Sequence, residues 1–174
     1  MAASIFYLTA DGRRQPQTKI LIIFGENSEI ILKINDITYK INGAIFEVNR
    51  ILGPGFLEKV YENALLIELN ECGVEAKSQV PINVLFKNNT VGKFVADILV
   101  ENKVIIEIKT VEKLAPIHKA QLLNYLKATG LNIGIIVNFK SKKAEIDRVV
   151  FNLSEEPDKS QSHLYNIKKL LQNN

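Results

Sequence analysis

Three charged residues near the middle of the chain have the types and the spacing of a hydrolytic metal site. Glu107 and Lys109 are two residues apart in a β-rich run, so both side chains project from the same face of a strand. Asp97 lies in the preceding β-rich run, from Val91 to Val100. Two carboxylates can share a divalent cation, which lowers the pKa of a bound water and neutralises charge on a phosphoryl group. Lys109 could position the attacking water or stabilise charge that develops on the phosphate.

The approach of Asp97 to Glu107 depends on the register of the hairpin between the two runs. In an antiparallel pair, opposed residues have position numbers with a constant sum. A three-residue loop from Glu101 to Lys103 sets this sum to 204, which places Asp97 directly across from Glu107. Opposed side chains have Cβ atoms about 4.5 to 5.5 Å apart. A two-residue turn would instead oppose Asp97 to Ile108 and turn its carboxylate to the other face.

Apolar residues surround the three charged side chains on their face of the strands. These residues are Val95, Leu99 and Ile105. Unpaired carboxylates are costly in such a surround, and a bound cation would resolve their repulsion. The single cysteine, Cys72, and two histidines cannot form an internal disulfide or a Cys/His zinc cage. Ligands that are all oxygen favour Mg²⁺ or Mn²⁺ as the cofactor.

An alternative interpretation treats the same residues as ordinary surface charges. The pattern E-x-K is common on amphipathic strands, where Glu107 and Lys109 would form a solvent-facing pair. Asp97 would then be an ordinary exposed acid. The two interpretations differ in whether these side chains face solvent.

Two acids on a preceding predicted helix are candidates for a further metal ligand. Glu58 and Glu62 are four residues apart and share a face of that helix. Glu58 is preferred because it lies in the first turn, beside the corner Gly53-Pro54-Gly55. The competing interpretation is a solvated acidic face. Tyr61, three residues after Glu58, is more typical of the core.

A later predicted helix, opened by Pro116, presents polar residues at spacings of three and four: His118, Gln121 and Tyr125. Gln121 could orient a water or contact a phosphate, and His118 could contact substrate. A single histidine near a helix start is usually a polar surface residue. Three lysines could contact a nucleic-acid backbone, although lysines on helices are most often solubilising: Lys113, Lys119 and Lys127.

The order of the elements predicts an α/β fold. Hydrophobic periodicity indicates two helices, a meander of three strands, a third helix that Gly130 ends, and a short apolar strand. Their expected ranges are about 36–52, 57–69, 81–86, 91–100, 104–110, 116–128 and 133–137. A strand, a helix and a strand in succession suggest a crossover that makes the last strand parallel within the sheet.

The two ends of the chain are expected to lie outside this domain, which we place at residues 36–152. Residues 1–35 read as an extension of uncertain structure, with strand-like apolar clusters at Ile20–Phe24 and Ile30–Ile34. Residues 153–174 read as a linker followed by a short helix around Leu164–Leu171.

Composition restricts the class of protein. The 174 residues suit one domain, and a hydrophobic content of 47% is enough for one core. A net charge of +3 permits contact with nucleic acid without demanding it. No stretch approaches the roughly 18 apolar residues of a membrane span, so we expect a soluble, cytoplasmic protein without membrane contact.

Three blocks of sequence, in this order, resemble the GxxExxxR protein family of the PD-(D/E)XK nuclease superfamily. They are Gly53 to Leu65, Asp97 to Lys109, and Pro116 to Lys127, within a match from about Ile37 to Val150. The resemblance implies a restriction-endonuclease-like αβββαβ core, a mixed sheet flanked by helices. The arginine that gives the family its name is replaced by Glu62 here, so a phosphate contact from that position would be lost or inverted in sign.

The resemblance also implies roles for individual residues. Asp97, Glu107 and Lys109 correspond to the D…ExK core, Glu58 to the acid carried by a helix, and Gln121 to the helix motif after the core strands. The implied activity is Mg²⁺-dependent hydrolysis of DNA phosphodiester bonds by a metal-activated water. A module that keeps the fold, lacks catalysis and binds nucleic acid or a protein is the alternative. The sequence does not fix the oligomeric state, and a homodimer is one possibility.

Overall fold

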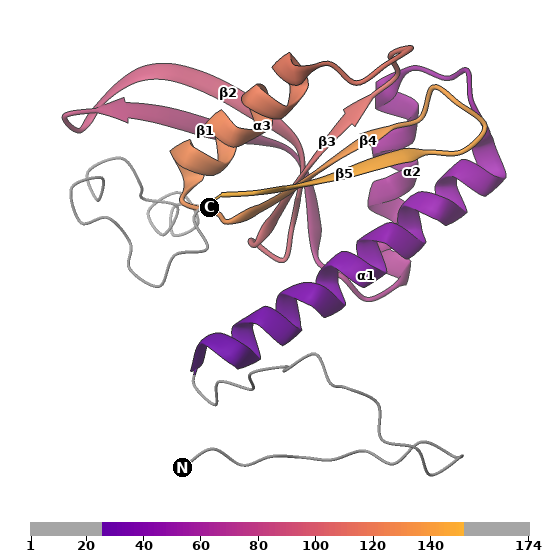
Figure 1. Cartoon of the computed structure of the whole chain (residues 1–174), viewed down its shortest axis with the longest axis horizontal. Coiled ribbons are helices and arrows are strands. Elements are labelled where there is room, and N and C mark those ends of the chain that lie inside the picture. The colour runs from indigo at the N-terminus through magenta and orange to yellow at the C-terminus, as the bar shows by residue number, and fades with distance from the viewer. Residues whose placement is uncertain (1–25, 152–174) are drawn as a thin grey trace, which may run out of the picture.

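The computed structural model describes residues 26–151, which form three helices and five strands (Figure 1). In chain order they are α1 Glu26–Leu52, α2 Glu58–Glu71, β1 Ala76–Phe86, β2 Asn89–Val100, β3 Val104–Lys109, α3 Pro116–Thr129, β4 Ile133–Asn138 and β5 Glu145–Val150. None of the helices in this described part has both the length and the apolar character needed to cross a membrane.

The five strands form one mixed sheet in the order β1-β2-β3-β4-β5. The pairs β1–β2, β2–β3 and β4–β5 are antiparallel, whereas β3 and β4 are parallel. Helix α3 connects the two parallel strands, as a crossover must. Figure 1 shows α1 and α2 on one side of the sheet and α3 on the other. The α/β fold with a mixed sheet and flanking helices is therefore confirmed.

The sheet separates two apolar cores. On one side, Ile106 and Ile108 of β3 pack in a cluster with residues of α1 and α2. On the other side, Ile105 packs in a cluster with Leu122 and Leu126 of α3. A strand covered on both faces reads as a continuous apolar run, which explains the composition of β3 and β4. A polar side chain in the middle of β3 must therefore be buried, whichever face it takes.

The corner between α1 and α2 is fixed by Tyr61. Helix α1 ends at Leu52, and Gly53 has the left-handed φ of 64° that ends many helices. The buried Tyr61 hydroxyl donates to the Gly53 carbonyl at 2.7 Å, and its ring stacks on Phe139 at 4.4 Å between centroids. Tyr61 thus belongs to the core, as its spacing indicates, and it orients the first turn of α2.

The structure corrects two expected boundaries and adds one strand. Helix α1 begins at Glu26, so the segment Ile30–Ile34 is helical and its prediction as a strand is wrong. A short apolar run cannot be assigned to a strand or a helix by periodicity alone. Strand β1 begins at Ala76 rather than Pro81, and a fifth strand, β5, lies beyond the last strand that the sequence predicts. The predicted elements at Ile20–Phe24 and Leu164–Leu171 lie outside the described residues.

Close packing of α3 on β4 makes Gly134 sensitive to substitution. A Cβ at this position would lie 2.7 Å from both Cδ atoms of Leu122, which is fully buried. We expect Gly134→Ala to lower the free energy of unfolding by about 1–3 kcal/mol through overpacking. Gly43→Ala is the matched control, because Gly43 is an exposed position of α1 with nothing within 4 Å of its added Cβ.

Urea unfolding of the two variants checks this packing. Gly43→Ala should raise the free energy of unfolding by about 0.5–1 kcal/mol, since alanine favours a helix interior over glycine. An equal response of the two variants would contradict the close contact between Leu122 and β4.

Candidate active site

The hairpin between β2 and β3 has the register that the sequence predicts. Residues 101–103 form the turn, and the pairs Val100↔Val104, Leu99↔Ile105 and Ile98↔Ile106 all sum to 204. The ladder ends there, one residue before Asp97 and Glu107 would pair. The two strands therefore separate at the position of the two carboxylates.

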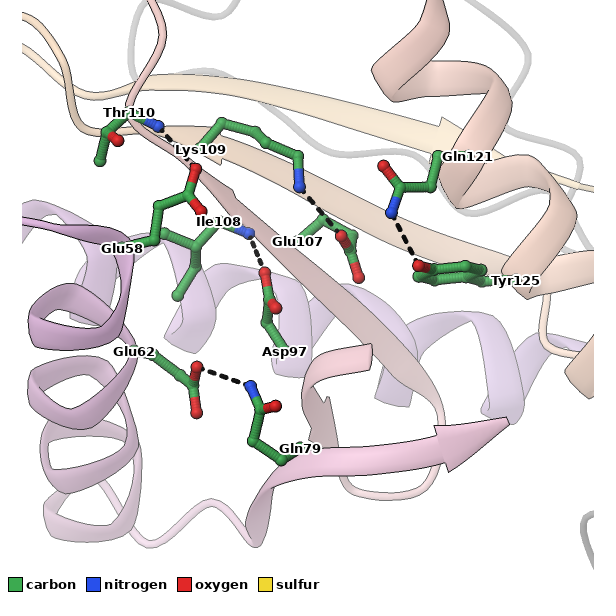
Figure 2. A network of polar contacts seen from close by, with 10 residues as sticks. All are labelled: Glu58, Glu62, Gln79, Asp97, Glu107, Ile108, Lys109, Thr110, Gln121 and Tyr125. Atoms are coloured by element: carbon green, nitrogen blue, oxygen red, sulfur yellow. Dashed lines mark hydrogen bonds and ion pairs between the residues drawn. The ribbon is translucent and has the colours of Figure 1, made fainter. Parts of the chain in front are cut away.

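The Asp97 carboxylate takes the place of the backbone carbonyl of β2 that would accept a hydrogen bond from β3 if the ladder continued. Its Oδ2 accepts the backbone N–H of Ile108 at 2.8 Å, as Figure 2 shows. A buried backbone N–H needs a partner, and here a side chain of β2 supplies it. This contact brings Asp97 to β3 beside Glu107.

Glu107 is a buried carboxylate with one oxygen left without a partner. The residue is 2% exposed, and its Oε2 lies 3.2 Å from the Nζ of Lys109. Its Oε1 is buried and has no hydrogen-bond partner among the described residues. Burial, and secondly the nearby charge of Asp97, raises the pKa of Glu107 to about 7. The alternative of a solvent-facing Glu107 and Lys109 pair is therefore wrong, since the Lys109 side chain is also only 15% exposed.

Negative charges outnumber positive charges around Glu107. Burial raises the pKa of Asp97, although the Ile108 N–H and Lys109 oppose this rise. Burial alone would lower the pKa of Lys109, but the carboxylates around it, above all Glu107, outweigh burial and raise it. Lys109 thus stays protonated at neutral pH and only partly compensates its acidic neighbours.

The two acids of α2 both lie near Asp97, but they differ in exposure and in hydrogen-bond partners. Glu58 is exposed, and its Oε1 accepts the backbone N–H of Thr110 at 3.1 Å, just beyond the end of β3. Glu62 is buried, at 4% exposure, and takes part in an ion pair with Lys59 at 2.6 Å. The interpretation of both acids as one solvated face is wrong for Glu62. Both charges raise the pKa of Asp97, and that of Glu62 does so more.

The donor set fits a divalent cation held by two carboxylates. Within residues 26–151, no group of three His, Cys, Asp or Glu side chains is arranged to hold a metal. Mg²⁺ needs fewer protein ligands than that, because it keeps several waters and is usually bound by one or two carboxylates together with substrate phosphates. The partnerless oxygen of Glu107 and the neighbouring Asp97 supply two such carboxylates. Glu58 as a third ligand stays a prediction.

Two of the polar candidates on α3, Gln121 and Tyr125, lie together beside the carboxylates. The amide of Gln121 donates to the Tyr125 hydroxyl at 2.7 Å (Figure 2). Tyr125 is buried, and the charges of Glu107 and Lys109 both act on its pKa, which burial raises. Gln121 is therefore held in one orientation near the site.

Two further candidates on α3, His118 and Lys119, already have partners. The Nδ1 of His118 accepts the Ala115 N–H at 3.1 Å, which satisfies a donor at the start of the helix. The Nζ of Lys119 lies 2.6 Å from the carboxylate of Asp147 on β5. Their predicted role as substrate contacts remains a prediction, and Lys119 would have to leave Asp147 to reach a phosphate.

Asn138 is a positioning residue that the sequence reasoning missed. It ends β4, is buried at 3% exposure, and lies beside Lys109 in the parallel register. Its side chain bonds both backbone groups of Val111, at 3.1 and 2.7 Å, while the Phe139 N–H donates to the Lys109 carbonyl at 2.9 Å. These bonds fix the chain just after Lys109. An amide directly after the apolar run 133–137 was the available signal.

Comparison with known proteins identifies the fold family. A family model of the PD-(D/E)XK nuclease superfamily matches residues 35–149. The chain belongs to this superfamily. The match covers nearly the whole sheet and all the residues of the site described above. A solved structure described as "Crystal structure of SSO0001" is similar at 23% sequence identity, with a TM-score of 0.45 over 67% of this chain and 59% of that one. No curated protein matches the chain.

Burial of Glu107 next to Asp97 disfavours its ionised form, and the effect on folding stability can be measured in the metal-free protein. The raised pKa of Glu107 means that the folded state holds its proton more tightly than the unfolded state. The resulting stability is fully present below pH 4.5 and is lost as the pH rises through about 7. Between pH 5 and pH 8 the wild type should lose about 2 kcal/mol more than Glu107→Gln.

Urea unfolding at both pH values, in the presence of a chelator, measures this difference. Excess Mn²⁺ at pH 8 should restore stability to the wild type and not to Glu107→Gln, because a ligand stabilises only a folded state that binds it. Parallel pH profiles of the two proteins would show that Glu107 has an ordinary pKa.

Proposed function

We propose that the protein is a Mg²⁺-dependent nuclease that hydrolyses phosphodiester bonds of DNA. Membership of the PD-(D/E)XK nuclease superfamily supports the class of reaction. The single observation that carries the proposal is the buried Glu107 oxygen, which has no partner within residues 26–151 and lies beside a second carboxylate and a protonated lysine. Within the superfamily we assign the chain to the GxxExxxR family, on the three blocks of sequence given above.

The proposed roles follow from the contacts of each side chain. Asp97 and Glu107 would hold Mg²⁺ or Mn²⁺, which when bound lowers the pKa of a water and neutralises phosphate charge. Lys109 keeps its proton beside Glu107, so its ammonium can donate to a phosphate oxygen or orient the attacking water. The amide of Gln121, oriented by Tyr125, can hold a water or a phosphate oxygen on the α3 side.

Glu58 has a different proposed role from the two buried acids. Its exposed carboxylate accepts the Thr110 N–H and lies close enough to influence both Asp97 and Lys109. From this position it can accept a hydrogen bond from a water of the metal, or join the ligands once substrate is bound. His118 and Lys119 are proposed to contact the DNA backbone beyond the cleavage site.

Cleavage assays with three variants test the function. Supercoiled, linear and single-stranded DNA are incubated with Mg²⁺ or Mn²⁺ and the wild type, Asp97→Asn, Lys109→Ala or Lys77→Ala. We expect Asp97→Asn and Lys109→Ala to lose at least about 100-fold of the rate, the usual scale for losing a group that stabilises transition-state charge. Lys77→Ala is the matched control, because the exposed Lys77 side chain forms an ion pair with the exposed Glu75, away from the carboxylates of the site.

Titration calorimetry separates metal binding by Asp97 from the catalytic role of Lys109. Asp97→Asn should lose Mn²⁺ binding, whereas Lys109→Ala should keep it and lose only cleavage. Equal cleavage by all four proteins would point to a contaminating nuclease and remove the basis of the proposal.

A second candidate is a module that binds nucleic acid or a protein partner and does not cleave. It is favoured by Glu62 at the position of the family arginine, where a phosphate contact from α2 would be lost. Such a module would bind DNA equally well with and without Mg²⁺. Wild-type protein that binds DNA but neither binds Mn²⁺ nor cleaves would support this candidate over the nuclease.

A further inference from the structure

Glu62 joins α2 to the edge strand of the sheet. Its side chain is 5% exposed, and both of its oxygens have partners. Oε1 lies 2.6 Å from the Nζ of Lys59, one turn earlier on the same helix, and Oε2 accepts the side-chain amide of Gln79 on β1 at 2.8 Å. The carboxylate is therefore engaged within the protein. At the position of the family arginine, this chain has a link between two elements.

Gln79, the partner of Glu62, has an unusual backbone conformation. Its φ is 55°, in the left-handed region, although it lies inside the strand Ala76–Phe86. A residue with a Cβ is strained there and keeps this conformation only where its surroundings enforce it. Ser78↔Ile98 and Val80↔Ala96 pair on either side, yet Gln79 has no partner on β2.

The residue of β2 opposite Gln79 is Asp97, and it also has no backbone partner. It would oppose Gln79 in the register of β1–β2, and it pairs with neither β1 nor β3. The alternation of β2 also breaks at this point. Ala96 packs in the core beneath α3, whereas Ile98, two residues later, packs in the core beneath α1 and α2. Strand β2 thus changes face at Asp97, and this change frees the carboxylate to reach the Ile108 N–H.

We infer that Glu62 and Gln79 are positioning residues for Asp97: the hydrogen bond between them holds the left-handed bend of β1, and this bend releases Asp97 from the sheet toward β3. Figure 2 shows Glu62 and Gln79 side by side next to Asp97. Lys59 completes the arrangement by compensating the buried charge of Glu62. The significance of the link for catalysis rests on the proposed function, whereas its effect on Asp97 is a property of the fold alone.

Two substitutions of Gln79 separate the side-chain bond from the backbone strain. Gln79→Ala removes the amide and leaves a Cβ in the left-handed region, so the bend should relax. Gln79→Gly also removes the amide, but glycine adopts positive φ freely and can keep the bend without the link. Asp97 should therefore be displaced in Gln79→Ala and stay near its native position in Gln79→Gly. Gln79 is exposed on an edge strand, so both variants should fold.

Hydrogen exchange of the Ile108 amide, followed by NMR without metal or DNA, reports on the position of Asp97. This amide donates to Asp97, so its exchange rate should rise about tenfold or more in Gln79→Ala, relative to amides of β4 as an internal reference. In Gln79→Gly and in the control Lys77→Ala it should change less than threefold. Equal rates in the alanine and glycine variants, raised or not, would overturn the inference.

Substitutions of Glu62 test the other half of the link. Glu62→Ala should match Gln79→Ala, and the double variant should exchange no faster than either single one, because both remove the same bond. Glu62→Gln keeps an oxygen that can accept the Gln79 amide, so Ile108 should exchange nearly as in the wild type. Additive effects of the two alanine substitutions would contradict a shared role.

Mn²⁺ affinity measured by calorimetry links the bend to the proposed site. Residues that orient metal ligands typically contribute 10–100-fold to affinity. Gln79→Ala should lose about tenfold and Gln79→Gly clearly less. If the wild type does not bind Mn²⁺ while the Ile108 amide still responds as described, the metal site fails and the positioning role stands. If the wild type binds Mn²⁺ and cleaves DNA but Ile108 does not respond, the positioning role fails alone.

Discussion

The hydrogen bond from the Ile108 N–H to the Asp97 carboxylate is the contact on which the site depends. The ladder between β2 and β3 stops at Ile98↔Ile106, and continuing it by one residue would close the strands together. The side chain of Asp97 accepts this N–H at 2.8 Å from N to Oδ2. The strands can therefore separate without leaving the N–H of Ile108 buried and unpaired. The separation makes room for two carboxylates beside the buried apolar residues of β2, β3 and β4.

The energetic consequence is a concentration of negative charge that the protein itself does not neutralise. Within residues 26–151, the cations beside Asp97, Glu107, Glu58 and Glu62 are Lys109 and Lys59, which leaves a formal charge of −2 when all six are ionised. Glu107 bears most of this imbalance, because it is nearly fully buried and one of its oxygens has no partner. Strongly shifted carboxyl groups of this kind gather at functional sites, and a divalent cation would balance the charge.

Local rules were sufficient for the part of the site that lies on one hairpin. The period of two put Glu107 and Lys109 on one face, and the centre of the turn at residues 101–103 fixed which residue faces Glu107. Pro116 and Gly130 likewise set the limits of α3 closely, because each has a backbone preference of its own. These features need no knowledge of the rest of the molecule.

Features that depend on contacts between distant elements were not predictable in this way. The bend at Gln79 breaks the alternation that a strand pattern assumes, and nothing in the neighbouring sequence requires a positive φ there. Asn138 gains its role only when β4 lies parallel to β3. The burial of Glu62 requires Gln79 to meet it across 17 residues of chain. Each depends on tertiary packing, which local patterns do not encode.

The carboxylate of Glu62 shows why a change of charge at this position need not remove the site. An arginine would bring a positive charge close to Asp97, whereas Glu62 brings a negative one and raises the pKa of Asp97. Its two partners leave it no free oxygen, so its influence on a bound cation would be electrostatic and through the conformation of β1. A negative charge there disfavours ionisation of Asp97 and would attract a divalent cation. Glu62 therefore argues against a phosphate contact from this position of α2, and its charge is compatible with a cation between Asp97 and Glu107.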